Sequence, residues 1–126
     1  MMDIDRESFE EIVEKVFQQL PDHFREALEN LAVFTEDYPS EEIVRQMHLP
    51  SKYHLLGLYQ GIPLTKRGVW YGMTAVTPDK ISLYKNNILH HCRDEHELES
   101  RIREVLIHEI GHYFGMNEEE IRAAGF

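Results

Sequence analysis

The stretch VLIHEIGHYFGMNEEE, residues 105–120, contains side chains whose types and spacing could do chemistry. His108 and His112 lie four residues apart, so on a helix their imidazoles share one face and converge. Two histidines at this spacing can bind one tetrahedral zinc ion at about 2.0–2.1 Å. Glu109 lies beside them, where a carboxylate can take a proton from a water that zinc has made more acidic. The motif HExxH therefore predicts a zinc site with Glu109 as general base.

Chance could place such a motif in a chain with 8 histidines and 23 acidic residues. Its context argues against chance, because the apolar residues Val105, Leu106 and Ile107 precede it within a long helical pattern. Gly111 is the small residue often found inside the motif, and Gly115 follows the second histidine. We therefore expect a bound transition metal here.

A catalytic zinc site needs a third protein ligand and an open position. Glu118 lies six residues after His112, and Gly115 between them allows the chain to turn back toward the metal. Two histidines and one carboxylate form an established catalytic zinc set. We predict Glu118 as the third ligand, with Glu119 and Glu120 as substitutes.

Helix capping offers another explanation for these acidic residues. Asn117 is a plausible N-cap, and Glu120 three residues on would complete a capping box. Acidic side chains are also favoured in the first turn of a helix. The two explanations are compatible, because Glu118 at the first helical position can still face a metal.

The remaining pattern predicts an α+β fold in which a long helix packs on a small sheet. Helices are expected where apolar residues recur at three- and four-residue steps: 5–19, within 21–30, 40–47 after a Ser40 cap, 93–115 and 117–125. Strands are expected in three segments rich in apolar, β-branched and aromatic residues: 31–39, 55–64 (LLGLYQGIPL) and 80–89 (KISLYKNNIL). Residues 65–79 between the last two strands contain two glycines and a proline, which predict a long loop.

Composition limits the class of protein. A chain of 126 residues predicts one domain, 1–126, and a net charge of −10 argues against nucleic acid as a partner. The single cysteine, Cys92, excludes an intramolecular disulfide. With no leader pattern and no run of about 20 apolar residues, we expect a cytoplasmic protein without a membrane partner. Nothing in the sequence indicates the oligomeric state.

The sequence resembles the minimal zincin family, small cytoplasmic proteins regarded as possible zinc metallopeptidases. The resemblance extends over segments 9–40, 55–68, 78–89 and 105–121 in the family's order, and the last is the most specific. It implies a minimal zincin-like fold, with a small mixed sheet packed against helices that include the HExxH helix. It also implies one zinc ion per chain, ligands His108 and His112, an acidic third ligand best matched by Glu118, and Glu109 as base.

The resemblance does not supply a substrate, but the hypothesis of a zinc peptidase predicts a peptide or flexible protein segment. In the zincins that the chain resembles, a substrate lies along an exposed strand edge. KISLYKNNIL is the expected edge strand, because Lys85, Asn86 and Asn87 keep it polar. Candidates for stabilising the oxyanion are Tyr84, Tyr71 and Arg67, which the sequence does not rank. For each of them a role in packing or at the surface is the more common one. The segment LHHC, residues 89–92, lacks partner ligands at finger spacing and is expected to be a strand end rather than a second metal site.

Three functions remain open at this point. The first is a zinc peptidase, and the second is a non-catalytic zinc module that binds a peptide or protein partner. The third is a metal-dependent hydrolase of another substrate such as RNA, which the acidic charge disfavours.

Overall fold

The computed structural model describes residues 2–61 and 79–124. Most of the expected loop 65–79, with Arg67 and Tyr71, lies outside these residues. Within them the helices are α1 (Arg6–Gln19), α2 (Asp22–Glu29), α3 (Glu41–Gln46), α4 (Lys85–His90), α5 (Glu95–Tyr113) and α6 (Glu118–Ala123). The strands are β1 (Ala32–Glu36), β2 (Gly57–Gln60) and β3 (Lys80–Tyr84).

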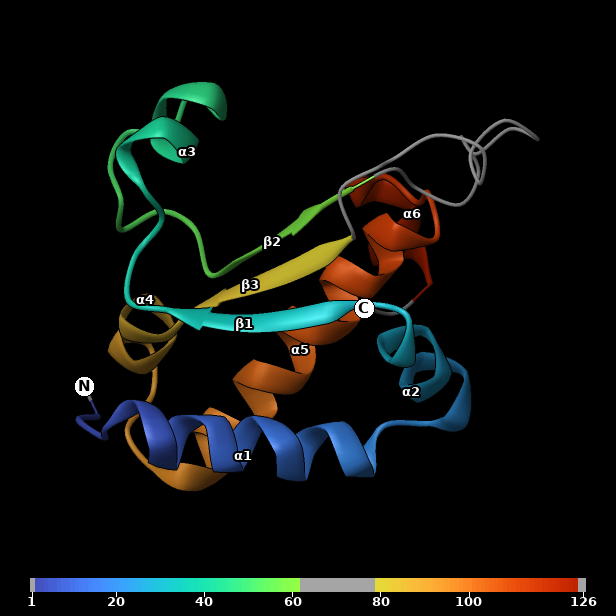
Figure 1. Ribbon diagram of the computed structural model, residues 1–126, viewed down its shortest axis with the longest axis horizontal. Coiled ribbons are helices and arrows are strands. Elements are labelled where there is room, and N and C mark those ends of the chain that lie inside the picture. The colour runs from blue at the N-terminus through green and yellow to red at the C-terminus, as the bar shows by residue number, and fades with distance from the viewer. Residues whose placement is uncertain (1, 62–78, 125–126) are drawn as a thin grey trace.

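The three strands form one mixed sheet in the order β1-β3-β2, as Figure 1 shows. β1 runs parallel to β3, with Ala32 opposite Lys80, and β2 runs antiparallel to it, with Gly57 opposite Leu83. This small mixed sheet with its surrounding helices confirms the predicted α+β fold.

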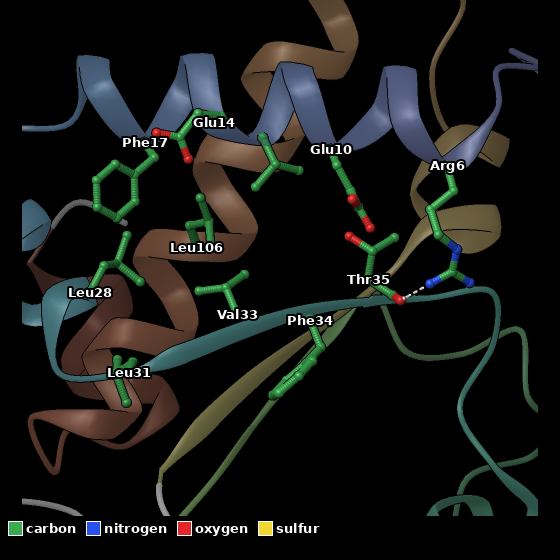
Figure 2. Close-up of a pocket in the computed structure, with 11 residues that line it drawn as sticks. Arg6, Glu10, Glu14, Phe17, Leu28, Leu31, Val33, Phe34, Thr35 and Leu106 are labelled. Atoms are coloured by element: carbon green, nitrogen blue, oxygen red, sulfur yellow. Dashed lines mark hydrogen bonds between the residues drawn. The ribbon is translucent and has the colours of Figure 1, made fainter.

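Helix α5 is the main support of the sheet. It lies beneath the strands and packs against α1, α2, α4, β2 and β3 (Figure 1). Its apolar side chains meet those of α1, and Leu106 of α5 lies in the space between α1 and β1 (Figure 2). The core contains the fully or almost fully buried residues Phe9, Val16, Ile81, Leu83, Ile88, Leu98, Ile102, Leu106 and Ile110.

The predicted helix caps are confirmed. The Oγ atom of Ser40 accepts a hydrogen bond from the Ile43 N–H at 3.2 Å at the start of α3. Asn117 and Glu120 form a complete capping box at the start of α6. Both caps satisfy N–H groups that have no partner inside the helix.

The prediction of one strand over 80–89 is wrong in its second half. β3 ends at Tyr84, and residues Lys85–His90 form helix α4. Short apolar runs do not distinguish a buried strand from a buried helix, and here Ile88 and Leu89 enter the core from a helix. The segment LHHC is therefore the end of α4 and its cap, not a strand end.

β3 is also the central strand, not an edge. Both of its faces are covered, because Ile81, Ser82, Leu83 and Tyr84 are all buried. Among the described strands, the edges are β1 and β2. No helix within residues 2–61 and 79–124 has the length and apolar character needed to cross a membrane.

Candidate metal centre

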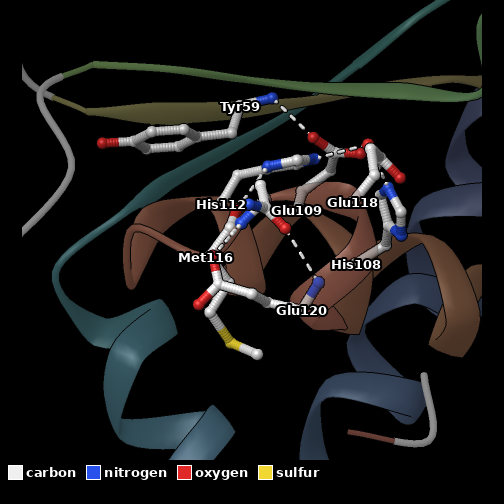
Figure 3. A network of polar contacts seen from close by, with 8 residues as sticks. Tyr59, His108, Glu109, His112, Met116, Glu118 and Glu120 are labelled. Atoms are coloured by element: carbon white, nitrogen blue, oxygen red, sulfur yellow. Dashed lines mark hydrogen bonds and ion pairs between the residues drawn. The ribbon is translucent and has the colours of Figure 1, made fainter. Parts of the chain in front are cut away.

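Helix α5 presents His108 and His112 on one side, with their ring centroids 5.0 Å apart. The Nε2 atoms of both rings lie 2.9 Å from the same oxygen, Oε1 of Glu118 (Figure 3). One ligand atom from each of His108, Glu109 and His112 also lies within 4.8 Å of the others. The four side chains singled out from the sequence therefore converge on one small volume.

Glu118 reaches this volume because the chain reverses after α5. Gly115 has a φ of +88°, a left-handed conformation that glycine adopts readily, and the amide of Met116 bonds back to the Gly111 carbonyl at 3.0 Å. The α6 helix then begins at Glu118 and packs closely on α5. A Cβ atom at Gly111 would lie 2.8 Å from Ile121 of α6, so the small residue inside the motif makes room for α6.

The two histidines also set the charge state of Glu118. Its partial burial by itself would raise the pKa of this carboxyl, but hydrogen bonds and charge from His108 and then His112 outweigh burial and lower the pKa. Glu118 is thus held ionised, as a metal ligand must be. Its side chain is 59% exposed, so one side of the cluster is open to solvent.

A backbone carbonyl fixes the orientation of His112. The Nδ1–H group of its ring donates to the Met116 carbonyl at 3.1 Å (Figure 3). Since a carbonyl only accepts, Nδ1 carries a hydrogen, and Nε2 is the ring nitrogen that faces Glu118 and that a metal would bind. Histidines that bind metals are generally oriented by such a second hydrogen bond.

Glu109 points toward β2 and is 7% exposed. Its Oε1 atom accepts a hydrogen bond from the backbone N–H of Tyr59 at 2.9 Å (Figure 3). Burial raises the pKa of this carboxyl, although the charges of His112 and His108 and the Tyr59 N–H act in the opposite direction. A raised pKa brings a carboxylate closer to what a general base needs near neutral pH.

Strand β2 packs closely on side chains of helix α5 at Gly57. A Cβ atom there would lie 2.5 Å from Val105 Cγ1 and 3.6 Å from Glu109 Cγ. Glycine therefore allows the edge strand to come within reach of Glu109. Beside this contact lies a pocket of about 330 Å³, lined by His54, Leu55, Leu56, Gly57, Arg101, Glu104, Val105, His108 and Glu109.

Tyr84 does not belong to this site. Its neighbour Leu83 lies opposite Gly57, on the sheet face that packs against α5, so Tyr84 points to the other face. There it lines a different pocket, with residues of β1 and α3. Burial and then the charge of Glu36 raise the pKa of Tyr84 to about 12. The suggestion of Tyr84 as an oxyanion donor is wrong, and Arg67 and Tyr71 lie outside the described residues.

Sequence reasoning missed two groups, the Tyr59 N–H and the Met116 carbonyl. Both are backbone groups, so no pattern of residue types predicts their positions. Gly57 was the available signal for the first, because an isolated glycine inside a strand pattern often marks close approach of another element.

The sequence pattern of the zincin-like metallopeptidase family matches residues 28–126, which include α5, α6 and all three described strands. The chain therefore belongs to the zincin-like metallopeptidase family. No curated protein matches it. The clustered His108, Glu109 and His112 and the family together indicate a zinc-binding, peptidase-like protein.

The burial of Glu109 gives the metal-free protein a specific pH dependence. Its raised pKa means that the folded state binds the Glu109 proton more tightly than the unfolded state. Stability from this group is present below the ordinary glutamate pKa and is lost as pH rises through the folded-state pKa. Glu109→Gln removes this loss, so the stability of the variant relative to the parent should be greater at pH 8 than at pH 5. Urea unfolding in chelator at both values measures it, and a pH-independent difference would contradict the assignment.

Proposed function

We propose that the protein is a zinc-dependent peptidase that holds one zinc ion through His108, His112 and Glu118. The observation that carries the proposal is the shared 2.9 Å distance from Glu118 Oε1 to the two Nε2 atoms. It brings two imidazole nitrogens and one carboxylate together, which is a common catalytic zinc set. Glu109 is turned to β2 by the Tyr59 N–H and is thereby left for proton transfer.

The donor set fits zinc chemically. His112 is held in the tautomer that presents Nε2, and Glu118 is held ionised. Three protein ligands would leave one position for water or substrate, and the exposed side chain of Glu118 leaves the cluster accessible to solvent. When bound there, zinc supplies a Lewis acid that polarises a peptide carbonyl and increases the acidity of water.

The residues of this chain supply proton transfer and positioning. Glu109 takes the proton of the attacking water and delivers it to the leaving nitrogen, which balances the hydrolysis of one peptide bond. The Tyr59 N–H holds this carboxylate in place, and burial keeps its basicity high. Among the described residues around the cluster, the distances identify no side chain as a hydrogen-bond donor to the oxyanion.

Strand β2 is the edge along which a peptide substrate would lie. It borders Glu109 directly, and its ladder to β3 uses the Leu56 carbonyl, which accepts from the Tyr84 N–H at 2.9 Å. In an antiparallel ladder, every second residue directs its N–H and C=O groups away from the partner strand. The N–H and C=O groups of Gly57 therefore point away from β3. A substrate pairing there would place a side chain near the adjacent 330 Å³ pocket, whose inner wall is formed by Leu55, Leu56 and Val105. This replaces β3 as the proposed substrate edge.

We further propose a peptide or flexible protein segment as the partner, rather than nucleic acid, because the chain carries a net charge of −10. The free and buried Cys92 is consistent with the reducing conditions of the cytoplasm, where we propose that the protein acts.

The test is zinc content measured by mass spectrometry on protein purified without a histidine tag or chelator. We expect about one zinc ion per chain, and Glu118→Ala should weaken zinc binding at least tenfold. This lower limit follows from outer-shell substitutions, which already cost about 10–100-fold in metal affinity.

Glu119→Ala is the matched control, because it removes the neighbouring exposed carboxylate from the same turn of α6. Retained zinc in Glu118→Ala together with lost zinc in Glu119→Ala or Glu120→Ala would reassign the third ligand. Absence of zinc from the parent, even after zinc is supplied, would overturn the proposal.

A further inference from the structure

Among the described strands, β1 is the second edge of the sheet and is separated from β2 by β3. The Ala32 N–H donates to the Asp79 carbonyl at 3.2 Å, on the side of β3. Backbone groups alternate along a strand, so those of Val33 and Thr35 point away from β3. The Arg6 guanidinium, which donates to the Thr35 carbonyl from that outer side, agrees with this direction.

A groove of about 470 Å³ lies between this edge and helix α1 (Figure 2). Its apolar wall is formed by Val13, Phe17, Leu28, Leu31, Val33 and Leu106. Glu10 and Glu14 lie one turn apart on α1. Glu10 extends toward Thr35 of β1, whereas Glu14 lies beside Phe17 and accepts a hydrogen bond from Gln18 at 2.9 Å (Figure 2). The groove thus combines an open strand edge, an apolar wall and two carboxylates.

We propose that this groove binds an extended peptide segment that carries basic side chains and pairs antiparallel with β1 as a fourth strand. The outward N–H and C=O groups of Val33 and Thr35 recognise extended backbone, as in other cases of strand addition. The carboxylates of Glu10 and Glu14 select cations. A second copy of this chain fits less well, because its own Glu10 and Glu14 would approach the same groove and each chain carries a charge of −10.

The register of β1 specifies the segment. Side chains directly opposite Thr35 and Val33 lie on the same sheet face as these residues, which is the face toward α1. Basic residues at these two positions would lie near Glu10 and Glu14. An apolar residue opposite Leu31 would lie against the apolar end of the groove. Arg6 must leave the Thr35 carbonyl, so in the free protein it caps the edge.

The peptide Ac-Lys-Thr-Lys-Thr-Val-NH2 carries this pattern and is the probe. Titrated into ¹⁵N-labelled protein, it should produce saturable shifts of the Val33 and Thr35 amide signals, whereas Ac-Glu-Thr-Glu-Thr-Val-NH2 should not. The double substitution Glu10→Gln and Glu14→Gln should weaken binding roughly three- to tenfold, as expected for two exposed ion pairs. Arg6→Ala should tighten binding, because it removes both the cap and a like charge.

Val33→Pro tests the backbone contact directly. It removes an outward N–H that the ladder to β3 does not use, and proline is tolerated on edge strands. It should abolish binding, whereas Val33→Ala, which keeps the N–H, should retain it. Equal binding by Val33→Pro and Val33→Ala would overturn the proposal, as would shifts confined to β2 or no saturable shifts at millimolar peptide. Self-association in sedimentation equilibrium that Val33→Pro abolishes would assign the edge to a second copy instead.

Discussion

Glu109→Gln is expected to retain zinc and to lose hydrolysis. The substitution keeps the size of the side chain and the oxygen that accepts the Tyr59 N–H, but it removes the ability to take a proton from water. General base catalysis contributes about 10²–10⁴-fold to rate, so peptide cleavage should fall by about this factor. Zinc content by mass spectrometry and cleavage of a peptide library by the zinc-loaded protein measure both halves of the prediction.

Glu104→Gln is the matched control for this experiment. It makes the same chemical change at an exposed position of α5 beside the same pocket, and it should leave the rate of cleavage nearly unchanged. Cleavage by Glu109→Gln at the parental rate would show that the base is another group. A parent that binds zinc and peptides but cleaves none of the library would favour the non-catalytic zinc module, because such a site needs no base beside its open position.

The second large effect is expected from His108→Ala, which should abolish stoichiometric zinc binding. A ligand that binds only the folded state stabilises it, by about 2.7 kcal/mol when its free concentration is 100 times its Kd. The parent should gain stability of this order when zinc is added at that ratio, and His108→Ala should gain almost none. Thermal or urea unfolding with zinc and with chelator measures the gain.

His96→Ala is the control, because His96 is an exposed histidine in the first turn of the same helix. It should keep the full stabilisation by zinc. Equal stabilisation of His108→Ala and the parent would mean that zinc binds elsewhere, and the peptidase proposal would lose its basis.

The parts of the fold set by local chemistry could be predicted from the sequence. Ser40, the Asn117–Glu120 capping box and Gly115 each act within a few residues of their own position, and each lies where the sequence places a helix end. The convergence of His108 and His112 follows from helix geometry alone. These features need no knowledge of the rest of the molecule.

The parts that depend on distant segments could not be predicted. Whether Ile88 and Leu89 enter the core from a strand or a helix depends on the residues they pack against, because a short apolar run is typical of both a buried strand and a buried helix. The central position of β3 depends on pairing with two strands that both precede it in the sequence. The Tyr59 N–H reaches Glu109 across fifty positions of the chain, and a backbone donor leaves no trace in the residue types.

The close approach at Gly57 has a mechanical consequence. The contacts between strand β2 and helix α5 include the packing of Gly57 on Val105 and the bond from the Tyr59 N–H to Glu109. Because the Tyr59 N–H bonds directly to the Glu109 carboxylate, a displacement of this part of the strand also displaces the hydrogen-bond donor that holds the carboxylate. A peptide that displaces β2 as it binds therefore also changes the position of the proposed base, Glu109.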